Sequence, residues 1–171
     1  MTNFRKGLSN IKAFVFDVDG VLGMDKVWLH PNGEMLRTMN IKDGYAMQLA
    51  IRMGYKIAII SGGISESVKN RFIKLGIEDI FMNSQNKLED YNSFKKKYAL
   101  SDNEIVFMGD DLPDYEVMLQ AGMPTSPSSA SEEIKAISKY ISDKAGGEGA
   151  VRDIIQQVMR LQGKWNLKSE I

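Results

Sequence analysis

The most informative stretch of the chain is AFVFDVDGVL, which runs from Ala13 to Leu22. Its first four residues are apolar and include strong β-formers, and the run stops abruptly at Asp17. A continuous apolar run of this kind is typical of a strand that is buried on both faces, as in a parallel sheet. Asp17 and Asp19 then lie at the carboxyl end of that strand, where open α/β sheets bind their ligands.

Two further apolar runs repeat this arrangement along the chain. IAII at 57–60 is followed by Ser61, and IVFM at 105–108 is followed by Gly109 and Asp110. A weaker run, IFM at 80–82, precedes Lys87. Amphipathic helical patterns separate or follow these runs, at residues 45–52, 65–75, 87–98, 114–121 and 150–161. Alternation of buried strands and amphipathic helices predicts a single α/β domain over residues 1–171, with a doubly wound parallel sheet.

One segment breaks this alternation directly after the first strand. Residues 27–39 contain two short apolar stretches around Asn32 and Gly33, a pair that is typical of a hairpin turn. We therefore expect a β-hairpin inserted between the first strand and the first long helix. No boundary to a second domain is apparent, and residues 162–171 have the character of a C-terminal tail.

Composition narrows the classes of function. The chain has 171 residues, 43% of them hydrophobic and 26% charged, which is ordinary for one globular domain. No apolar run approaches the roughly 20 residues that span a bilayer, so we expect a cytoplasmic protein without a membrane partner. Lys plus Arg and Asp plus Glu number 22 each, so no basic field favours nucleic acid.

The same composition restricts the chemistry of any site. The chain has no cysteine and one histidine, which excludes thiolate metal sites and makes a multi-histidine zinc site improbable. A metal must therefore be held mainly by oxygen atoms, which favours Mg²⁺.

The polar residues that end the predicted strands suit phosphoryl chemistry. The carboxyl ends of parallel strands meet at one edge of a sheet, so Asp17, Ser61 and Asp110 are expected to lie together, with Lys87 nearby. Carboxylates hold a hard cation, and an aspartate can attack phosphorus. A second carboxylate can transfer protons, while a hydroxyl and a lysine stabilise charge on the transferring group.

Four motifs in this order resemble those of the haloacid dehalogenase superfamily of phosphatases. They are DVDGVL at 17–22, Ser61-Gly62, Lys87 and GDDLPD at 109–114. Three further segments extend the resemblance over nearly the whole chain, namely NIKDG at 40–44, GGEGAVR at 146–152 and QGK at 162–164. These segments resemble the 3-deoxy-D-manno-octulosonate 8-phosphate phosphatases within that superfamily.

The resemblance implies a Mg²⁺-dependent phosphatase with a HAD-like fold and no large cap domain. Its substrate would be a phosphorylated eight-carbon keto sugar acid used for lipopolysaccharide, and its reaction would pass through an aspartyl-phosphate. Members of the subfamily associate as tetramers, so the resemblance also implies a homotetramer.

The resemblance assigns roles residue by residue. Asp17 is the implied nucleophile and Asp19 the implied general acid and base, while Ser61 and Lys87 hold the phosphoryl group. The implied Mg²⁺ ligands are Asp17, the backbone carbonyl of Asp19 and Asp110, with Asp111 and Asp114 in support. The implied substrate contacts are Asp19, Asn40, Ile41, Lys42, Asp43, Gly44, Gly62, Arg71 and Lys87.

The sequence departs from the subfamily at two positions that bear on the substrate carboxylate. Gly63 stands where the family usually has arginine, and Gln48 also lacks a positive charge. Lys42 is the candidate replacement.

Some of these residues also have purely structural explanations, and other functions fit part of the same pattern. Asn40, Lys42 and Asp43 could also be cap residues for a following helix, and residues 146–149 suit a plain loop.

A phosphatase for nine-carbon keto acid phosphates of the sialic-acid branch is the nearest alternative function. A receiver-type signalling domain also combines aspartates, a hydroxyl and a lysine, although its phosphorylated aspartate ends a middle strand. A catalytically inactive binding subunit is disfavoured because every expected catalytic residue is present.

The spacing of the motifs leaves no room for a separate lid domain, either between Gly20 and the second strand or between Ser61 and Lys87. The hairpin is also more apolar than a free two-stranded ribbon tolerates. Its apolar residues are Trp28, Leu29, Met35, Leu36 and Met39. We therefore predict a closed homo-oligomer, a tetramer, in which hairpins and the 162–171 tail line shared active-site entrances.

Overall fold

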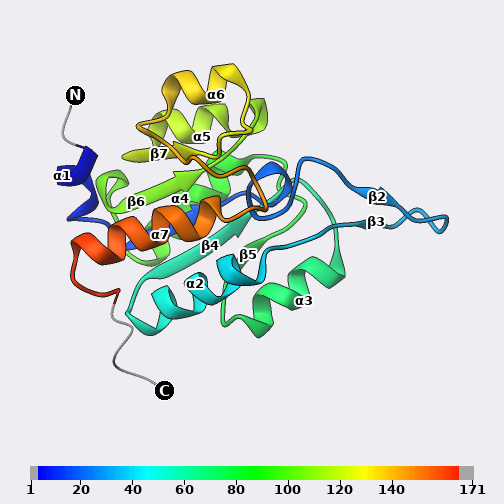
Figure 1. Cartoon of the computed structure of the whole chain (residues 1–171), viewed down its shortest axis with the longest axis horizontal. Helices are drawn as coiled ribbons and strands as arrows, with labels where there is room; N and C mark the ends of the chain where they lie inside the picture. The colour runs from blue at the N-terminus through cyan, green and yellow to red at the C-terminus, as the bar shows by residue number, and fades with distance from the viewer. Residues whose placement is uncertain (1–3, 166–171) are drawn as a thin grey trace.

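A computed structural model describes residues 4–165 and shows a sheet between two layers of helices (Figure 1). All neighbouring strands of the six-stranded sheet are parallel. Their spatial order is β5 (Asp79–Phe81), β4 (Lys56–Ile60), β1 (Ala13–Phe16), β6 (Ile105–Met108), β7 (Met123–Ser126) and β8 (Tyr140–Ile141). The order places β1 inside the sheet, with β4 and β6 as its neighbours.

Helices cover both faces of this sheet. One face packs against α1 (Phe4–Leu8), α2 (Ile41–Arg52), α3 (Glu66–Lys74) and α7 (Ala150–Leu161). The other packs against α4 (Lys87–Lys97), α5 (Tyr115–Gln120) and α6 (Glu132–Ile137). Short helical turns η1 (Val18–Leu22), η2 (Asp102–Glu104) and η3 (Leu112–Asp114) complete the chain. The doubly wound α/β prediction is confirmed.

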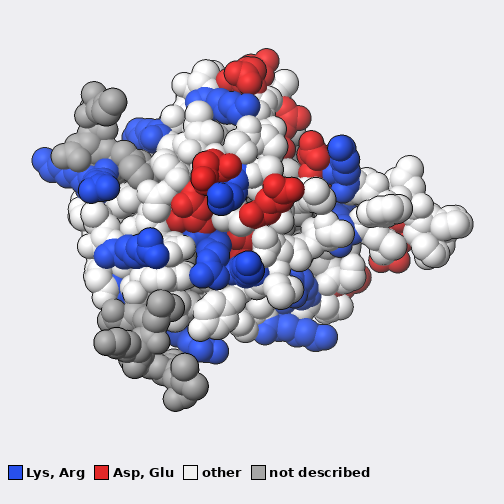
Figure 2. Space-filling view, viewed as in Figure 1, with Lys and Arg blue, Asp and Glu red and all other residues white. Residues whose placement is uncertain are grey.

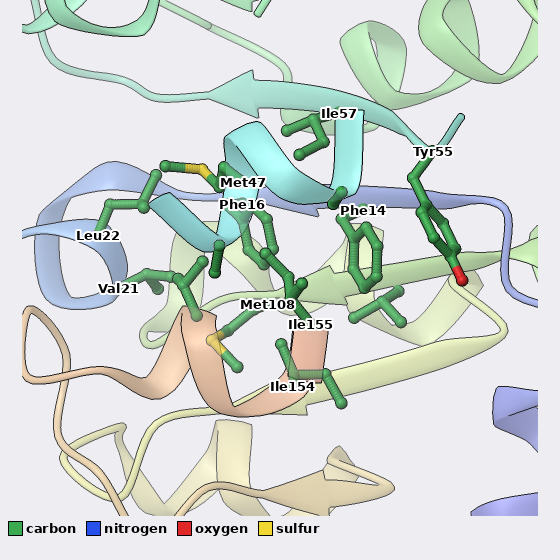
Figure 3. Packing of buried hydrophobic residues seen from close by; sticks show 14 of the residues in the cluster. Phe14, Phe16, Val21, Leu22, Met47, Tyr55, Ile57, Met108, Ile154 and Ile155 are labelled. Carbon is green, nitrogen blue, oxygen red and sulfur yellow. The ribbon is translucent and has the colours of Figure 1, made fainter. Parts of the chain in front are cut away.

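The alternation of side chains along β1 explains why it is apolar throughout. Phe14 and Phe16 point into the cluster beneath α2 and α7 (Figure 3), whereas Ala13 and Val15 point into the cluster beneath α4 and α5. All four side chains are fully buried. Burying each Phe side chain contributes roughly 1.5–3 kcal/mol, so β1 anchors both halves of the core.

The predicted hairpin is present as β2 (Trp28–Leu29) and β3 (Met35–Leu36), paired antiparallel. It projects from the body of the molecule (Figure 1), and its surface is largely uncharged (Figure 2). Gly33 has a φ of 88°, a left-handed conformation that favours glycine in the turn. Trp28 and Leu29 are 74% and 78% exposed.

Most predicted elements lie where the sequence pattern placed them, and the helix at 150–161 has the same bounds as α7. The helix predicted from Tyr45 begins earlier, at Ile41, because the Asn40 side chain accepts the Lys42 amide and caps it. The sequence pattern missed α1, β7, α6 and β8. β7 is buried but reads Met-Pro-Thr-Ser, so it lacks the apolar run that marked the other strands.

The intervals around the predicted active site are short. Between β1 and β4 the chain forms only η1, the hairpin and α2, and between β4 and β5 only α3, all within the described residues. Neither interval contains a lid domain. Among residues 4–165, no helix combines the length and apolar character needed to cross a membrane. Residues 166–171 of the predicted tail lie outside the described part, while Trp165 packs against the core.

Candidate active site

The sheet gathers the predicted motifs at the carboxyl ends of three adjacent strands. Phe16 of β1 pairs with Ile59 of β4 and with Met108 of β6. One or two residues beyond this register come Asp17, Ser61 and Asp110, so the parallel pairing brings their side chains to one edge. Asp17 and Ser61 are 7% and 2% exposed.

Gly20 lets the loop after β1 approach the loop after β6. Its φ is 78°, and a Cβ there would lie 1.9 Å from Oδ2 of Asp110. Any side chain at this position would therefore displace the Asp110 carboxylate. The Gly147 amide donates to the Val21 carbonyl at 2.8 Å, so the 146–149 segment braces the same loop.

Lys87 is the cation of the site and lies between two carboxylates. Its Nζ is 2.9 Å from Oδ2 of Asp17 and 2.7 Å from Oδ1 of Asp114, and the side chain is 8% exposed. Burial alone would lower the pKa of Lys87, but the charges of Asp17 and Asp114 outweigh burial and hold it above its usual value. A lysine at the first residue of a helix opposes the helix dipole, so its carboxylate partners account for its position.

Three carboxylates crowd around this lysine. One oxygen each from Asp17, Asp110 and Asp114 lies within 4.8 Å of the others. Burial and the charge of Asp114 raise the pKa of Asp17 well above its usual range, and the same two causes raise the pKa of Asp110 to about 7. One lysine does not neutralise this cluster, so its donor set suits a hard divalent cation such as Mg²⁺.

The supporting acids differ in their surroundings. Asp114 is 1% exposed, and its Oδ2 accepts the Asp110 amide at 3.1 Å, so it fixes both Lys87 and the Asp110 loop. Asp111 is exposed, and its charge contributes to the raised pKa of Asp110.

Ser61 ends β4 and begins a small cradle. Its amide donates to the Phe81 carbonyl at 2.9 Å, and its Oγ accepts the Gly63 amide at 3.2 Å. Ser65, not Ser61, caps α3, since its Oγ accepts the Val68 amide. Ser61 is therefore not used as the helix cap and faces the site with Gly62 and Gly63.

The structure adds one residue that the sequence analysis missed, namely Arg37. Nε and Nη2 of Arg37 donate to Oδ1 and Oδ2 of Asp19, at 2.6 and 2.9 Å. The residue reaches the site from the segment after β3, 18 positions away in the chain. The sequence offered one weak signal, namely a single charged residue among the apolar residues of the segment from Met35 to Met39.

The residues implied to contact the sugar acid form a second group beside this one. Gly44 on α2 packs against Arg71 on α3, since a Cβ at Gly44 would lie 2.9 Å from Nη2 of Arg71. A shallow pocket of about 270 Å³ lies alongside. It is lined by Arg37, Met39, Ile41, Ser67, Val68 and Arg71. Lys42 is exposed at the start of α2.

Asp43 and Gln162 serve the packing of α7 in this structure. The Asp43 side chain is 1% exposed, and its Oδ1 accepts the Arg152 amide at 2.7 Å, which joins α2 to α7. Gln162 donates to the carbonyls of Leu8 and Ile11 and accepts from the Tyr55 hydroxyl. Asp43 therefore faces α7 and not the pocket.

Comparison with known proteins agrees with this geometry. Residues 58–155 match the family model described as haloacid dehalogenase-like hydrolase. The chain is 33% identical to the 3-deoxy-D-manno-octulosonate 8-phosphate phosphatase of Salmonella typhi, over 95% of this chain and 87% of that protein. The chain belongs to the haloacid dehalogenase-like hydrolases. The receiver-domain alternative is thereby set aside for this hydrolase.

Solved structures extend the similarity to three dimensions. The 3-deoxy-D-manno-octulosonate 8-phosphate phosphatase of Yersinia pestis superposes on this hydrolase with a TM-score of 0.92 at 28% identity, covering 95% of this chain and 88% of that one. The enzyme of the same name from Moraxella catarrhalis, solved with magnesium, phosphate and KDO, gives a TM-score of 0.92 at 31% identity. It covers 96% of this chain and 95% of that one. Both of these relatives are named for an eight-carbon sugar-acid phosphate.

Proposed function

We propose that this hydrolase is a Mg²⁺-dependent phosphatase that converts 3-deoxy-D-manno-octulosonate 8-phosphate to the free sugar acid and phosphate. The observation that carries the proposal is the placement of Lys87 between Asp17 and Asp114, with Asp110 alongside, at one edge of the sheet. This arrangement supplies a buried nucleophile and opposing positive charge. The similarity to phosphatases of that name supports the choice of substrate.

The chain's own residues perform two displacements at phosphorus. A carboxylate oxygen of Asp17 forms a bond to phosphorus while the ester bond to the sugar oxygen breaks, and Asp19 gives a proton to that oxygen. Asp19 then takes a proton from water as the water oxygen attacks phosphorus and the bond to Asp17 breaks. Lys87, the Ser61 hydroxyl and the Gly62 amide hold the phosphoryl oxygens.

Asp17, Asp110 and the Asp19 carbonyl would hold the Mg²⁺, which would supply positive charge to keep Asp17 ionised and to offset charge on the transferring group. Asp111 and Asp114 support this site. For the sugar acid we propose contacts from Asn40, Ile41, Lys42, Gly44 and Arg71, of which Ile41 and Arg71 line the shallow pocket. The Asp43 side chain holds this segment against α7.

A phosphate-release screen tests the substrate. The panel contains the eight-carbon acid 8-phosphate, a nine-carbon keto acid 9-phosphate and a plain hexose 6-phosphate, each with and without Mg²⁺. We expect kcat/KM to be at least about tenfold higher for the eight-carbon acid than for the others, the size of one additional polar contact. Equal rates on all three would contradict the substrate assignment and leave only a general phosphatase.

We also propose that the protein is a single catalytic domain that works in the cytoplasm as a homotetramer, with a small sugar-acid phosphate as its substrate and lipopolysaccharide precursor synthesis as its role. The sequence resemblance to the octulosonate phosphatases supports these assignments. The exposed Trp28 and Leu29 of the hairpin support the oligomer, because exposed apolar surface of this size is commonly covered by a partner. A neighbouring protomer would supply that surface and close the active-site entrance. Light scattering of the purified protein tests the proposed mass.

A further inference from the structure

Arg37 is an arginine from the hairpin whose side chain is almost entirely buried in the active site. The side chain is 4% exposed, and all three guanidinium nitrogens have acceptors. Nε and Nη2 hold the two oxygens of Asp19, and Nη1 donates to the Met35 carbonyl at 2.8 Å. The guanidinium therefore forms a bidentate ion pair with Asp19, which fixes its orientation.

The guanidinium also lies beside the phosphoryl cradle. The position that a Cβ on Gly63 would occupy is 3.1 Å from Nη2 of Arg37. The same position is 3.5 Å from Oγ of Ser61 and 3.5 Å from Oδ2 of Asp19. One small volume above Gly63 is thus bordered by a cation, a hydroxyl and the carboxylate that transfers protons.

This arrangement conflicts with the work proposed for Asp19. To protonate a leaving group, Asp19 needs an oxygen that carries a proton and faces the substrate. In the structure both of its oxygens accept hydrogen bonds from Arg37. Protonating one of these oxygens removes the charge of the carboxylate and weakens its pairing with Arg37, so Asp19 can act as an acid only at the expense of this ion pair.

We propose that Arg37 binds the phosphoryl group of the substrate, exchanging the oxygens of Asp19 for phosphoryl oxygens as the substrate enters. A phosphate monoester carries close to two negative charges and presents oxygens that suit the guanidinium fork, so it competes well against one carboxylate. The exchange frees Asp19 only when a phosphoryl group is present. This inference rests on the proposed phosphatase function and adds a third binding group to Ser61 and Lys87.

Competitive inhibition by inorganic phosphate tests the proposal, because phosphate occupies the phosphoryl site without turnover. We would compare the wild type, Arg37→Gln, Arg37→Lys and the control Lys69→Gln, which removes one charge from the exposed side of α3. We expect the inhibition constant to rise about 10- to 100-fold in Arg37→Gln, the value of a hydrogen bond between charged groups. Arg37→Lys keeps the positive charge but loses the bidentate geometry, so its inhibition constant should lie between those of the wild type and Arg37→Gln. The inhibition constant of Lys69→Gln should stay within about twofold of the wild type.

The split between KM and kcat separates this role from simple positioning of Asp19. Binding by Arg37 predicts that KM and the phosphate inhibition constant rise together in Arg37→Gln. A fall in kcat with an unchanged phosphate inhibition constant would overturn the proposal, because Arg37 would then act only through Asp19. If the wild type neither hydrolyses sugar-acid phosphates nor binds phosphate, the proposed function fails. An active wild type beside an Arg37→Gln variant with unchanged phosphate affinity refutes only this inference.

Discussion

The sheet edge and the hairpin distribute charge and apolar surface in opposite ways. At the edge, Lys87 and Asp114 are buried charges, with side chains 8% and 1% exposed. On the hairpin, the apolar side chains of Trp28 and Leu29 are 74% and 78% exposed. Buried charges are costly unless they are paired, and exposed apolar surface is costly unless it is covered. The charges at the edge are thus paired within the chain, whereas the apolar surface of the hairpin stays exposed in the single chain.

Arg37 connects these two regions. It belongs to the segment that follows β3, yet its guanidinium lies at Asp19 in the buried site. The position of the hairpin therefore affects an active-site residue as well as the molecular surface. The following predictions test how far the two regions act independently, in order of decreasing effect.

The largest effect is expected at the nucleophile. Asp17→Asn removes the carboxylate that would bond to phosphorus, so turnover should fall by at least about 10⁴-fold while the protein stays folded. Phosphate release and thermal melting are the measurements. Glu116→Gln, the same acid-to-amide change at an exposed position on α5, is the control. Substantial activity in Asp17→Asn would move the nucleophile elsewhere.

The second effect concerns the cation at the same edge. A chelator should abolish activity and Mg²⁺ should restore it, because three crowded carboxylates offer only oxygen ligands. Asp110→Asn removes one ligand charge, so we expect the Mg²⁺ concentration for half-maximal activity to rise by about tenfold or more. Titration of activity with Mg²⁺ measures this. An unchanged midpoint in Asp110→Asn would exclude Asp110 as a ligand.

The third effect concerns the hairpin and its covering surface. If the proposed homotetramer forms through the hairpin, the double variant Trp28→Asp and Leu36→Asp should dissociate it and lower activity several-fold. Unfolding free energy of the protomer should fall by only about 1 kcal/mol, the cost of replacing one exposed cross-strand pair by two like charges. Leu119→Asp on α5, where Leu119 is 61% exposed, is the matched control and should leave the mass unchanged. A wild type that is monomeric and fully active would show that the hairpin needs no neighbour.

The smallest effect on activity is expected at Asp43, a carboxylate buried away from Lys87. Burial raises the pKa of Asp43 to about 6 from a usual value of 3.8, so the folded state binds its proton more tightly than the unfolded state does. Stability should therefore fall as pH rises from about 4 to about 6, by on the order of 2 kcal/mol. Asp43→Asn should remove this part of the slope. Denaturant unfolding of both proteins at several pH values measures the difference, and identical slopes would place the titration elsewhere.

Much of the fold could be predicted because its signals are local. The runs at 13–16, 57–60 and 105–108 are apolar because their strands are buried on both faces, so composition alone marks them. Each run is followed by a polar residue, and parallel strands place such residues at one edge. For this reason the grouping of Asp17, Ser61 and Asp110 could be predicted from the sequence. The sequence pattern did not reveal β7 because this strand is buried by its position in the sheet and not by the hydrophobicity of Pro124, Thr125 and Ser126.

The contacts that the sequence pattern could not reveal join distant segments. The Arg37–Asp19 ion pair depends on how the segment after β3 returns to the end of η1, where Met39 pairs with Gly23. Its two residues carry no mark of each other in the sequence. Likewise, the sequence predicts that Asp43 is a helix cap or a ligand contact. Only the packing of α2 on α7 brings the Arg152 amide close enough to donate to its carboxylate. The sequence by itself determined which polar residues end the buried strands, since hydrophobic periodicity and strand ends are properties of neighbouring residues. The tertiary structure alone decided which charges pair, because pairing depends on distances between segments that no local pattern encodes.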